Sequence, residues 1–411
     1  MCLGVADGKE CKVNMKTKLS KDASILLAMG CLFMSGFMIA STFVNVYLLR
    51  LTGNMGLMIL QTIANYFMIL SGFLIGTYYT KKGGSMLNLL RIGIASIILY
   101  YALILILKEK ASTYLIFLGL CNGIGQGFYY FTFNILVGQL LNETERPKFF
   151  GFQSSFSYIF GVLAPSISGA IIVRFSELTG YYVLFAATVF VLVMSIFFSM
   201  QLKKVDSHQS YTIFPVLMEK GNKFWNLNKY VNFTNGFTQA IYGQIFTVFA
   251  YLIISNEATI GNLSSTMSLI GVVSSLFIAS KVTTPAKQKQ FHLYYCFGYL
   301  IALGGLGLFA SKVSLYIAYI VLGLVTCWYN VIYQNQKYQF STRAAGKFTQ
   351  SDYVITTEFP IAAGRISGLV IFYILNTIIG GTIVYRILLV AITLVPFLDH
   401  YIVQKVANWL E

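Results

Sequence analysis

Residues 180–200 read GYYVLFAATVFVLVMSIFFSM, an apolar run of 21 residues without a charged side chain. An α-helix needs about 20 mostly apolar residues to cross the hydrocarbon core of a bilayer. A β-strand is not expected, because the run lacks the alternation of an outer-membrane barrel and a helix satisfies its own backbone groups inside lipid. This stretch therefore predicts a transmembrane helix.

The same kind of run recurs eleven more times along the chain. The others cover residues 25–49, 56–80, 87–107, 111–140, 149–175, 231–254, 259–280, 291–309, 313–340, 349–375 and 381–403. Of the 411 residues, 57% are hydrophobic and 10% are charged, against roughly 25% charged in soluble domains. We therefore predict an all-α polytopic membrane protein with 12 transmembrane helices.

Loop charges predict the orientation of these helices. If the N-terminus is cytoplasmic, 22 of the 29 Lys and Arg side chains lie in cytoplasmic segments and five lie outside. Such an excess marks the cytoplasmic side, so we expect a multi-pass protein of the cell (plasma) membrane with both termini in the cytoplasm. The net charge of +15 then reports orientation, and no nucleic-acid partner is expected.

The twelve runs form two sets of six around a polar stretch. The expected organisation is a cytoplasmic tail (1–24), a six-helix half (25–200), a cytoplasmic linker (201–229), a second half (230–404) and a short tail (405–411). A shift of 200 residues places Gly36 on Gly236 and Lys81 on Lys281, which favours two pseudo-symmetric halves. We expect the protein to be a monomer in the bilayer.

Two motifs along the chain resemble those of one known family. The loop after the second run reads GTYYTKKGG (76–84), which is similar to the signature between helices 2 and 3 of the major facilitator superfamily, with Thr80 in place of the usual acid. Residues 151–169, GFQSSFSYIFGVLAPSISG, resemble the glycine- and proline-rich helix 5 motif that is reported mostly in exporters. The resemblance implies the major facilitator fold and a secondary transporter. It favours export and makes Lys81, Lys82 and Lys281 candidates for the cytoplasmic gate.

Three shorter segments look similar to a poorly characterised branch of that family from low-GC Gram-positive bacteria. They are FVNVYL (43–48), GFYYFTFN (127–134) and EFPIAAGR (358–365). This similarity implies a fold and no substrate.

Glu358 and Arg365 are the most informative ionisable pair, because a charge inside a span is costly and marks function by default. They are seven residues apart, about 10.5 Å along one helix face, so each should face a central path or a partner on another helix. Pro360 should kink the helix between them. Glu358 is the candidate for proton coupling, and Arg365 either tunes it or holds an anionic part of the substrate. The alternative is a fixed polar contact with an Asn or Gln of residues 313–340 or 231–254.

Further candidate substrate-binding residues come from the helices that line the central path in the family. They are Asn45, Asn122, Gln126, Tyr129, Tyr130, Asn134, Gln239, Asn330 and Gln334. Asn122, Gln126 and Tyr129 form one helical stripe. Interhelical hydrogen bonding is the alternative role for each amide. Gly119, Gly123 and Gly127 predict close helix packing.

Signs of catalysis or of a cofactor are lacking in the sequence. It contains no H-E-x-x-H and no Walker loop, and His208, His292 and His400 lie far apart along the chain. The six cysteines form no C-x-x-C pair, so neither a metal site nor a disulfide framework is expected. Arg386 and Asp399 are expected to snorkel from the ends of the last span.

The sequence thus predicts a secondary transporter that works by alternating access, and no enzyme. The leading hypothesis is a proton-coupled exporter of a small amphipathic compound. One alternative is a flippase for a lipid or a lipid-linked precursor. Another is a non-transporting sensor or assembly protein on the same fold.

Overall fold

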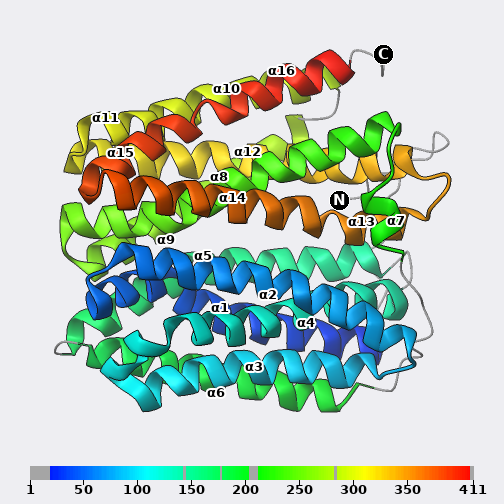
Figure 1. Cartoon of the computed structure of the whole chain (residues 1–411), viewed down its shortest axis with the longest axis horizontal. Helices are drawn as coiled ribbons and strands as arrows, with labels where there is room; N and C mark the ends of the chain where they lie inside the picture. The colour runs from blue at the N-terminus through cyan, green and yellow to red at the C-terminus, as the bar shows by residue number, and fades with distance from the viewer. Residues whose placement is uncertain (1–18, 142–144, 176–177, 203–211, 282–284, 408–411) are drawn as a thin grey trace.

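The computed structural model describes residues 19–141, 145–175, 178–202, 212–281 and 285–407 (Figure 1). Throughout these ranges the secondary structure is helical, without a strand. The first six long helices are α1 (Lys21–Thr52), α2 (Met55–Lys81), α3 (Met86–Leu107), α4 (Leu115–Leu140), α5 (Arg146–Arg174) and α6 (Thr179–Met200). A 3-10 helix, η1 (Lys108–Tyr114), joins α3 to α4.

The second part of the chain repeats this order with more interruptions. Its helices are α7 (Phe214–Leu217), α8 (Lys223–Ile254), α9 (Glu257–Lys281), α10 (Pro285–Tyr299), the π-helix η2 (Leu300–Gly304), α11 (Gly305–Phe309), α12 (Lys312–Ala344), α13 (Gln350–Thr356), α14 (Glu358–Ile378), α15 (Gly381–Ile392) and α16 (Val395–Ala407). The corresponding helices α1 and α8 are both 32 residues long.

Ten stretches in the described ranges are long and apolar enough to cross a membrane. One of them, Met86–Val137, contains both α3 and α4. Helix α9, with 25 residues, completes the set of twelve. The prediction of an all-α membrane protein with 12 transmembrane helices is therefore confirmed.

Several predicted boundaries were wrong, most clearly around the linker. Residues 201–229 were assigned to a polar loop, but α7 and the first turns of α8 lie in this range. The Asn222 side chain caps α8 by accepting from the Trp225 amide, and the buried Trp225 indole donates to the Val216 carbonyl at 2.8 Å. A local cap and one buried ring thus extend the helix into a region of low hydropathy.

The helices pack as two neighbouring groups with parallel long axes. Figure 1 shows α1–α6 together on one side, α8 and α10–α16 on the other, and α9 beside α5. The groups meet where α5 contacts α9, α2 contacts α14 and α1 contacts α8.

Glycine spacing explains the tight packing inside the first group. A Cβ added to Gly119, Gly123 or Gly127 would come within 2.2–2.6 Å of backbone carbonyls of α2. The predicted small-residue ridge on α4 is therefore confirmed, and it packs against α2.

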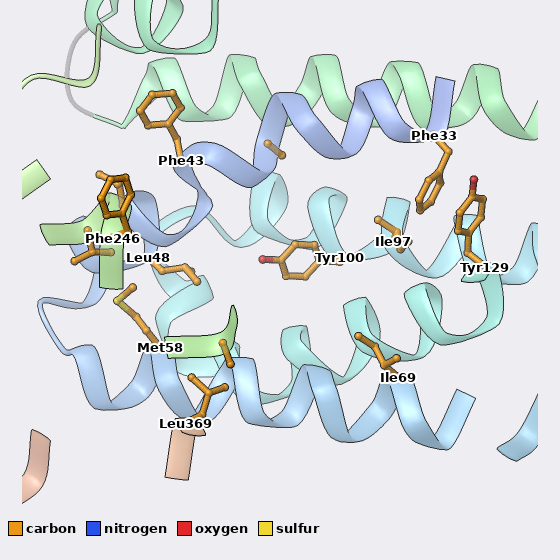
Figure 2. Close-up of a cluster of buried hydrophobic side chains, with 14 of the residues drawn as sticks. Phe33, Phe43, Leu48, Met58, Ile69, Ile97, Tyr100, Tyr129, Phe246 and Leu369 are labelled. Atoms are coloured by element: carbon orange, nitrogen blue, oxygen red, sulfur yellow. The ribbon is translucent and has the colours of Figure 1, made fainter. Parts of the chain in front are cut away.

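In the described part of the chain, the buried core joins the two groups at one end. Leu48 of α1 and Met58 of α2 lie near Phe246 of α8 and Leu369 of α14 (Figure 2). Along the chain, Leu48 and Met58 flank the loop at Gly53. At the opposite end of the second group, two separate clusters contain residues of that group alone; one includes Tyr333 and the other Trp225. Within the described residues, the buried apolar core thus joins the groups at the Gly53 end and does not extend between them at the Lys81 end.

Candidate functional site

The backbone of the eleventh span is interrupted beside the predicted site. Helix α13 ends at Thr356 and α14 begins at Glu358. Pro360 has no amide hydrogen, so the carbonyl of Thr356 loses its helical donor. The helix is continuous from Glu358 to Arg365, where the kink was expected; the interruption lies at Thr357, before both residues, and places Glu358 in the first turn of α14.

Close contact between α14 and α8 fixes the site from one side. A Cβ on Gly236 would lie 2.1 Å from the carbonyl oxygen of Ile361, and one on Gly364 would lie 2.0 Å from that of Phe233. Only glycine permits this approach. The contact places the polar side chains of α8 beside those of α14.

Glu358 forms an ion pair that the sequence analysis did not predict. Its Oε1 lies 3.7 Å from Nζ of Lys337 on α12, and the two side chains are 26% and 14% exposed. At this distance the charges attract each other without a close hydrogen bond. A signal was available in the sequence, because Lys337 follows Asn330 and Gln334 at helical i, i+4, i+7 spacing.

Arg365 binds Gln239 of α8 and an aromatic ring of α2. Its Nε and Nη2 donate to Gln239 Oε1 at 3.2 and 2.6 Å. The guanidinium carbon lies 5.0 Å from the centroid of the Tyr66 ring, a cation–π geometry. Gln239 is exposed and Arg365 is partly exposed, although both belong to membrane-length helices.

Two tyrosines complete the surroundings of this charged group. The Tyr130 hydroxyl on α4 interacts electrostatically with Arg365, Glu358 and Tyr66. Tyr333 on α12 does the same with Glu358 and Arg365, and it donates to Asn232 Oδ1 at 2.6 Å. Helices from both groups therefore converge on Glu358 and Arg365.

The remaining polar candidates are spread over several environments. Asn45 donates from Nδ2 to the Gly243 carbonyl at 3.2 Å, which links α1 to α8. Asn134, Asn330 and Gln334 are exposed. Asn122, Gln126 and Tyr129 lie along one stripe of α4, where Gln126 and Tyr129 are buried and Asn122 is half-buried.

The packing of that stripe is seen at Tyr129 and Asn122. The Tyr129 ring stacks on Phe33 of α1 with 3.4 Å between centroids (Figure 2), and Gln126 is also buried. Asn122 Oδ1 is buried without a hydrogen-bond partner. Of the α4 candidates, Tyr130 is the one that the described contacts bring to the charged group.

The gate lysines lie at helix ends. Lys81 ends α2 and is exposed, and Lys82 Nζ lies 4.5 Å from the centroid of the Tyr78 ring. Lys281 ends α9, but its side chain lies outside the described part of the structure. Thr80, which replaces the family acid, is fully buried and donates to the Thr77 carbonyl at 3.1 Å.

The Gly53 end carries a polar contact between the two groups that the sequence did not predict. Arg50 Nη1 of α1 lies 2.8 Å from Glu257 Oε1 of α9. The Tyr181 hydroxyl of α6 donates to the same oxygen at 3.0 Å. Glu257 is only 6% exposed and the Arg50 side chain is 32% exposed, so this part-buried bond links the two groups at the Gly53 end.

Helix α5 makes further polar contacts between the groups. The Ser166 amide donates to Ser265 Oγ at 3.1 Å, and its hydroxyl lies 2.9 Å from Asn262 Oδ1. A Cβ on Gly169 would lie 2.5 Å from the Glu257 carbonyl oxygen. The residues resembling the helix 5 motif therefore form the contact with α9.

Asp399 corrects one expectation. It was expected to snorkel, but it is 4% exposed and its Oδ1 has no hydrogen-bond partner. The α16 helix turns this side chain toward α8, α10 and α12, so it cannot reach the helix end. Arg386 instead donates from Nε to the Gly307 carbonyl at 2.8 Å and also to that of Leu308.

The histidines that lie far apart in the sequence are partly brought together. His292 Nδ1 and His400 Nδ1 are 3.1 Å apart, whereas His208 lies outside the described residues. Among the described side chains, no group of three or more His, Cys, Asp or Glu is arranged to hold a metal ion.

Known proteins share this architecture. The family profile described as Major Facilitator Superfamily matches residues 25–350. The Bacillus subtilis (strain 168) protein named "Uncharacterized protein YqgE" is 26% identical over 379 residues, which cover 89% of this chain and 85% of that protein. This relative agrees with the expected branch from low-GC Gram-positive bacteria.

Solved structures share the fold at low sequence identity. A bacterial homologue of the iron transporter ferroportin in an inward-facing state has a TM-score of 0.69 at 14% identity, covering 95% of this chain and all of that one. A D-xylose-proton symporter has a TM-score of 0.66 at 12% identity, covering 91% and 97% of the two chains. Twelve membrane-length helices in this arrangement, together with a profile match over most of the sequence, mean that the chain belongs to the Major Facilitator Superfamily of membrane transporters.

Proposed function

We propose that this protein is a proton-coupled secondary transporter that exports a small amphipathic compound across the cell membrane. The observation that carries the proposal is the charged group of Glu358, Lys337 and Arg365, which lies partly exposed on helices long enough to span the bilayer. Charges at such positions are costly and are kept for transport or coupling.

Glu358 is the proposed coupling carboxylate, and Lys337 is the partner that makes coupling effective. A proton on Glu358 removes the attraction to Lys337 across 3.7 Å and leaves the ammonium free. The site then presents two cations, Lys337 and Arg365, which repel a cationic part of the substrate and favour its release. Loss of the proton restores the carboxylate, which attracts that cationic part, so proton and substrate bind in turn, as an exporter driven by an inward proton gradient requires.

The aromatic rings around these charges favour an amphipathic substrate. Tyr66 already lies 5.0 Å from the guanidinium carbon of Arg365, and Tyr130 and Tyr333 face the same charges. Ring faces hold apolar and cationic groups, while the hydroxyls can hydrogen-bond. Export is supported by the motif-like residues of α5, which form the seam with α9.

Alternating access is the proposed mechanism. The apolar core and the Arg50–Glu257 bond join the two helical groups at the Gly53 end. The basic loops favour a cytoplasmic position for the Lys81 end. In this arrangement the site faces the cytoplasm, and both termini are cytoplasmic. Opening of the Gly53 end would release substrate outside.

The test begins with a thermal-shift screen of the purified monomer against metabolites, drugs and lipids, since a ligand of the folded state raises the melting temperature. A stabilising compound is then loaded into proteoliposomes with an imposed pH gradient. Glu358→Gln should still exchange the compound but lose accumulation against its gradient. Glu109→Gln, a change at an exposed residue of η1, should behave like wild type. Accumulation by Glu358→Gln at the wild-type rate would exclude the coupling role, and a lipid hit would favour a flippase.

A further inference from the structure

Asp399 is a deeply buried carboxyl group away from the charged site. It lies in α16, within the last membrane-length stretch, Gly381–Lys405. Its side chain is 4% exposed, and its Oδ1 is buried without a hydrogen-bond donor. An ionised carboxylate normally accepts several hydrogen bonds, so a buried carboxylate oxygen that accepts none is unusual.

The groups that face Asp399 from the packed helices carry no positive charge. Tyr230 and Thr234 of α8 lie within hydrogen-bonding reach of it. Tyr295 and Cys296 of α10 and Tyr329 of α12 surround it electrostatically. The ion pairs found in the described ranges involve Glu257 and Glu358 and leave Asp399 without a cation.

Two histidines of the neighbouring helix surfaces, His292 of α10 and His400 of α16, are turned toward each other. His292 and His400 face one another through Nδ1 atoms 3.1 Å apart, so one nitrogen must donate and the other must accept. Two imidazolium ions cannot occupy this geometry. Lys289 acts on His400 from the solvent side, and His292 stacks on the rings of Tyr295 and Tyr329.

We propose that Asp399 is a second proton-binding site of this protein and is a neutral carboxylic acid in the conformation described. An unpaired charge in a buried apolar site costs several kcal/mol, and binding one proton from water removes that cost. The protonated oxygen also gains a donor that can reach the tyrosine and threonine oxygens of α8. The proton can leave when α16 shifts and water reaches the carboxyl group. This inference does not depend on the role of Glu358.

A series of side-chain contacts connects Asp399 to the charged group of Glu358, Lys337 and Arg365. Tyr329, which faces Asp399, stacks on Tyr333 with 5.7 Å between ring centroids. Tyr333 in turn faces Glu358 and Arg365. Loading of Asp399 therefore acts on the same segment of α12 that carries Lys337.

The experiment is infrared spectroscopy of the full chain in lipid at neutral pH. A protonated carboxyl group gives a C=O stretching band that an ionised carboxylate lacks. Wild type should show this band, and Asp399→Asn should lose it. Glu358→Gln and Asp22→Asn should retain it, which separates the two proposed proton sites. Carbon-13 labelling of aspartate in the unmutated protein should shift the band, so the assignment does not rely on a variant that folds.

Three results would overturn the inference. A missing band in wild type means that Asp399 is ionised, with compensation by the histidine pair or by water. A band that persists in a folded Asp399→Asn protein belongs to another carboxyl group. A band that shifts with labelled glutamate and not with labelled aspartate also belongs to a carboxyl group other than that of Asp399.

Discussion

Arg50–Glu257 joins helices from the two groups, whereas Lys337–Glu358 joins two helices of the same group. The first is short, at 2.8 Å, and its carboxylate also accepts from Tyr181. The second is longer, at 3.7 Å, and more exposed at its carboxylate. A pair between groups has to break when they separate. A loose pair within one group survives that motion and is free to respond to a proton or a substrate.

Among the changes considered, replacement of Arg50 by alanine should shift the balance between closed and open Gly53 ends the most. Glu257 would remain buried without its cation, which costs about 3–5 kcal/mol for a fully buried pair. Arg50 is about one-third exposed, so we expect about 3 kcal/mol. The balance between closed and open Gly53 ends should therefore shift by on the order of 100-fold.

Spin-label distances measure this shift in a cysteine-free background. Labels at Thr113 and Lys312 report on the Gly53 end, and labels at Lys82 and Lys347 report on the other. The exposed Arg174 at the end of α5 provides the matched arginine-to-alanine control. Unchanged distances in Arg50→Ala would show that the apolar core alone closes the Gly53 end.

A glycine change tests whether α8 and α14 move as one unit. Gly236→Ala pushes a Cβ to 2.1 Å from the Ile361 carbonyl oxygen, and overpacking of this kind costs about 1–3 kcal/mol. The melting temperature should fall. Gly243→Ala in the same helix meets nothing within 4 Å and gains helix propensity, so it should be neutral or stabilising. Equal effects of the two changes would contradict the close contact.

Asn45→Ala should have the smallest effect. It removes one exposed hydrogen bond of 3.2 Å between α1 and α8, and such bonds contribute about 0.6 kcal/mol. The spin-label populations at the Gly53 end should change by roughly threefold. A shift as large as that of Arg50→Ala would mean that Asn45 has a further role in holding the groups together.

Much of the fold could be predicted because it depends on local sequence. Runs of about 20 apolar residues predict the helices, and four-residue glycine spacing predicts a close helix contact on α4, although the partner helix α2 was known only from the structure. Boundaries failed where burial came from single residues in polar surroundings, as at Trp225. A hydropathy average is taken over a window of residues, so it does not detect a single buried ring, such as that of Trp225, at the end of a helix.

The charged site could be predicted only in part. Glu358 and Arg365 were identifiable because each is an ionisable group in an apolar run. Their partners Lys337 and Gln239 lie on other helices, so they depend on packing, although the spacing of Asn330, Gln334 and Lys337 was a usable signal. Asp399 was misjudged because distance from a helix end was taken as access to water, and a neighbouring helix surface removes that access.

The docking of α7 onto the second group leaves a short tether between the two halves. The Thr212 amide donates to Asp352 Oδ1 at 3.0 Å, and the Tyr353 hydroxyl donates to Glu219 at 2.5 Å. The chain from Ile213 onward is therefore anchored, and only the segment between Leu202 and Thr212 joins the halves. A fully extended segment of this length reaches about 35 Å. While α7 stays docked, that length is the upper limit on the distance between Leu202 and Thr212.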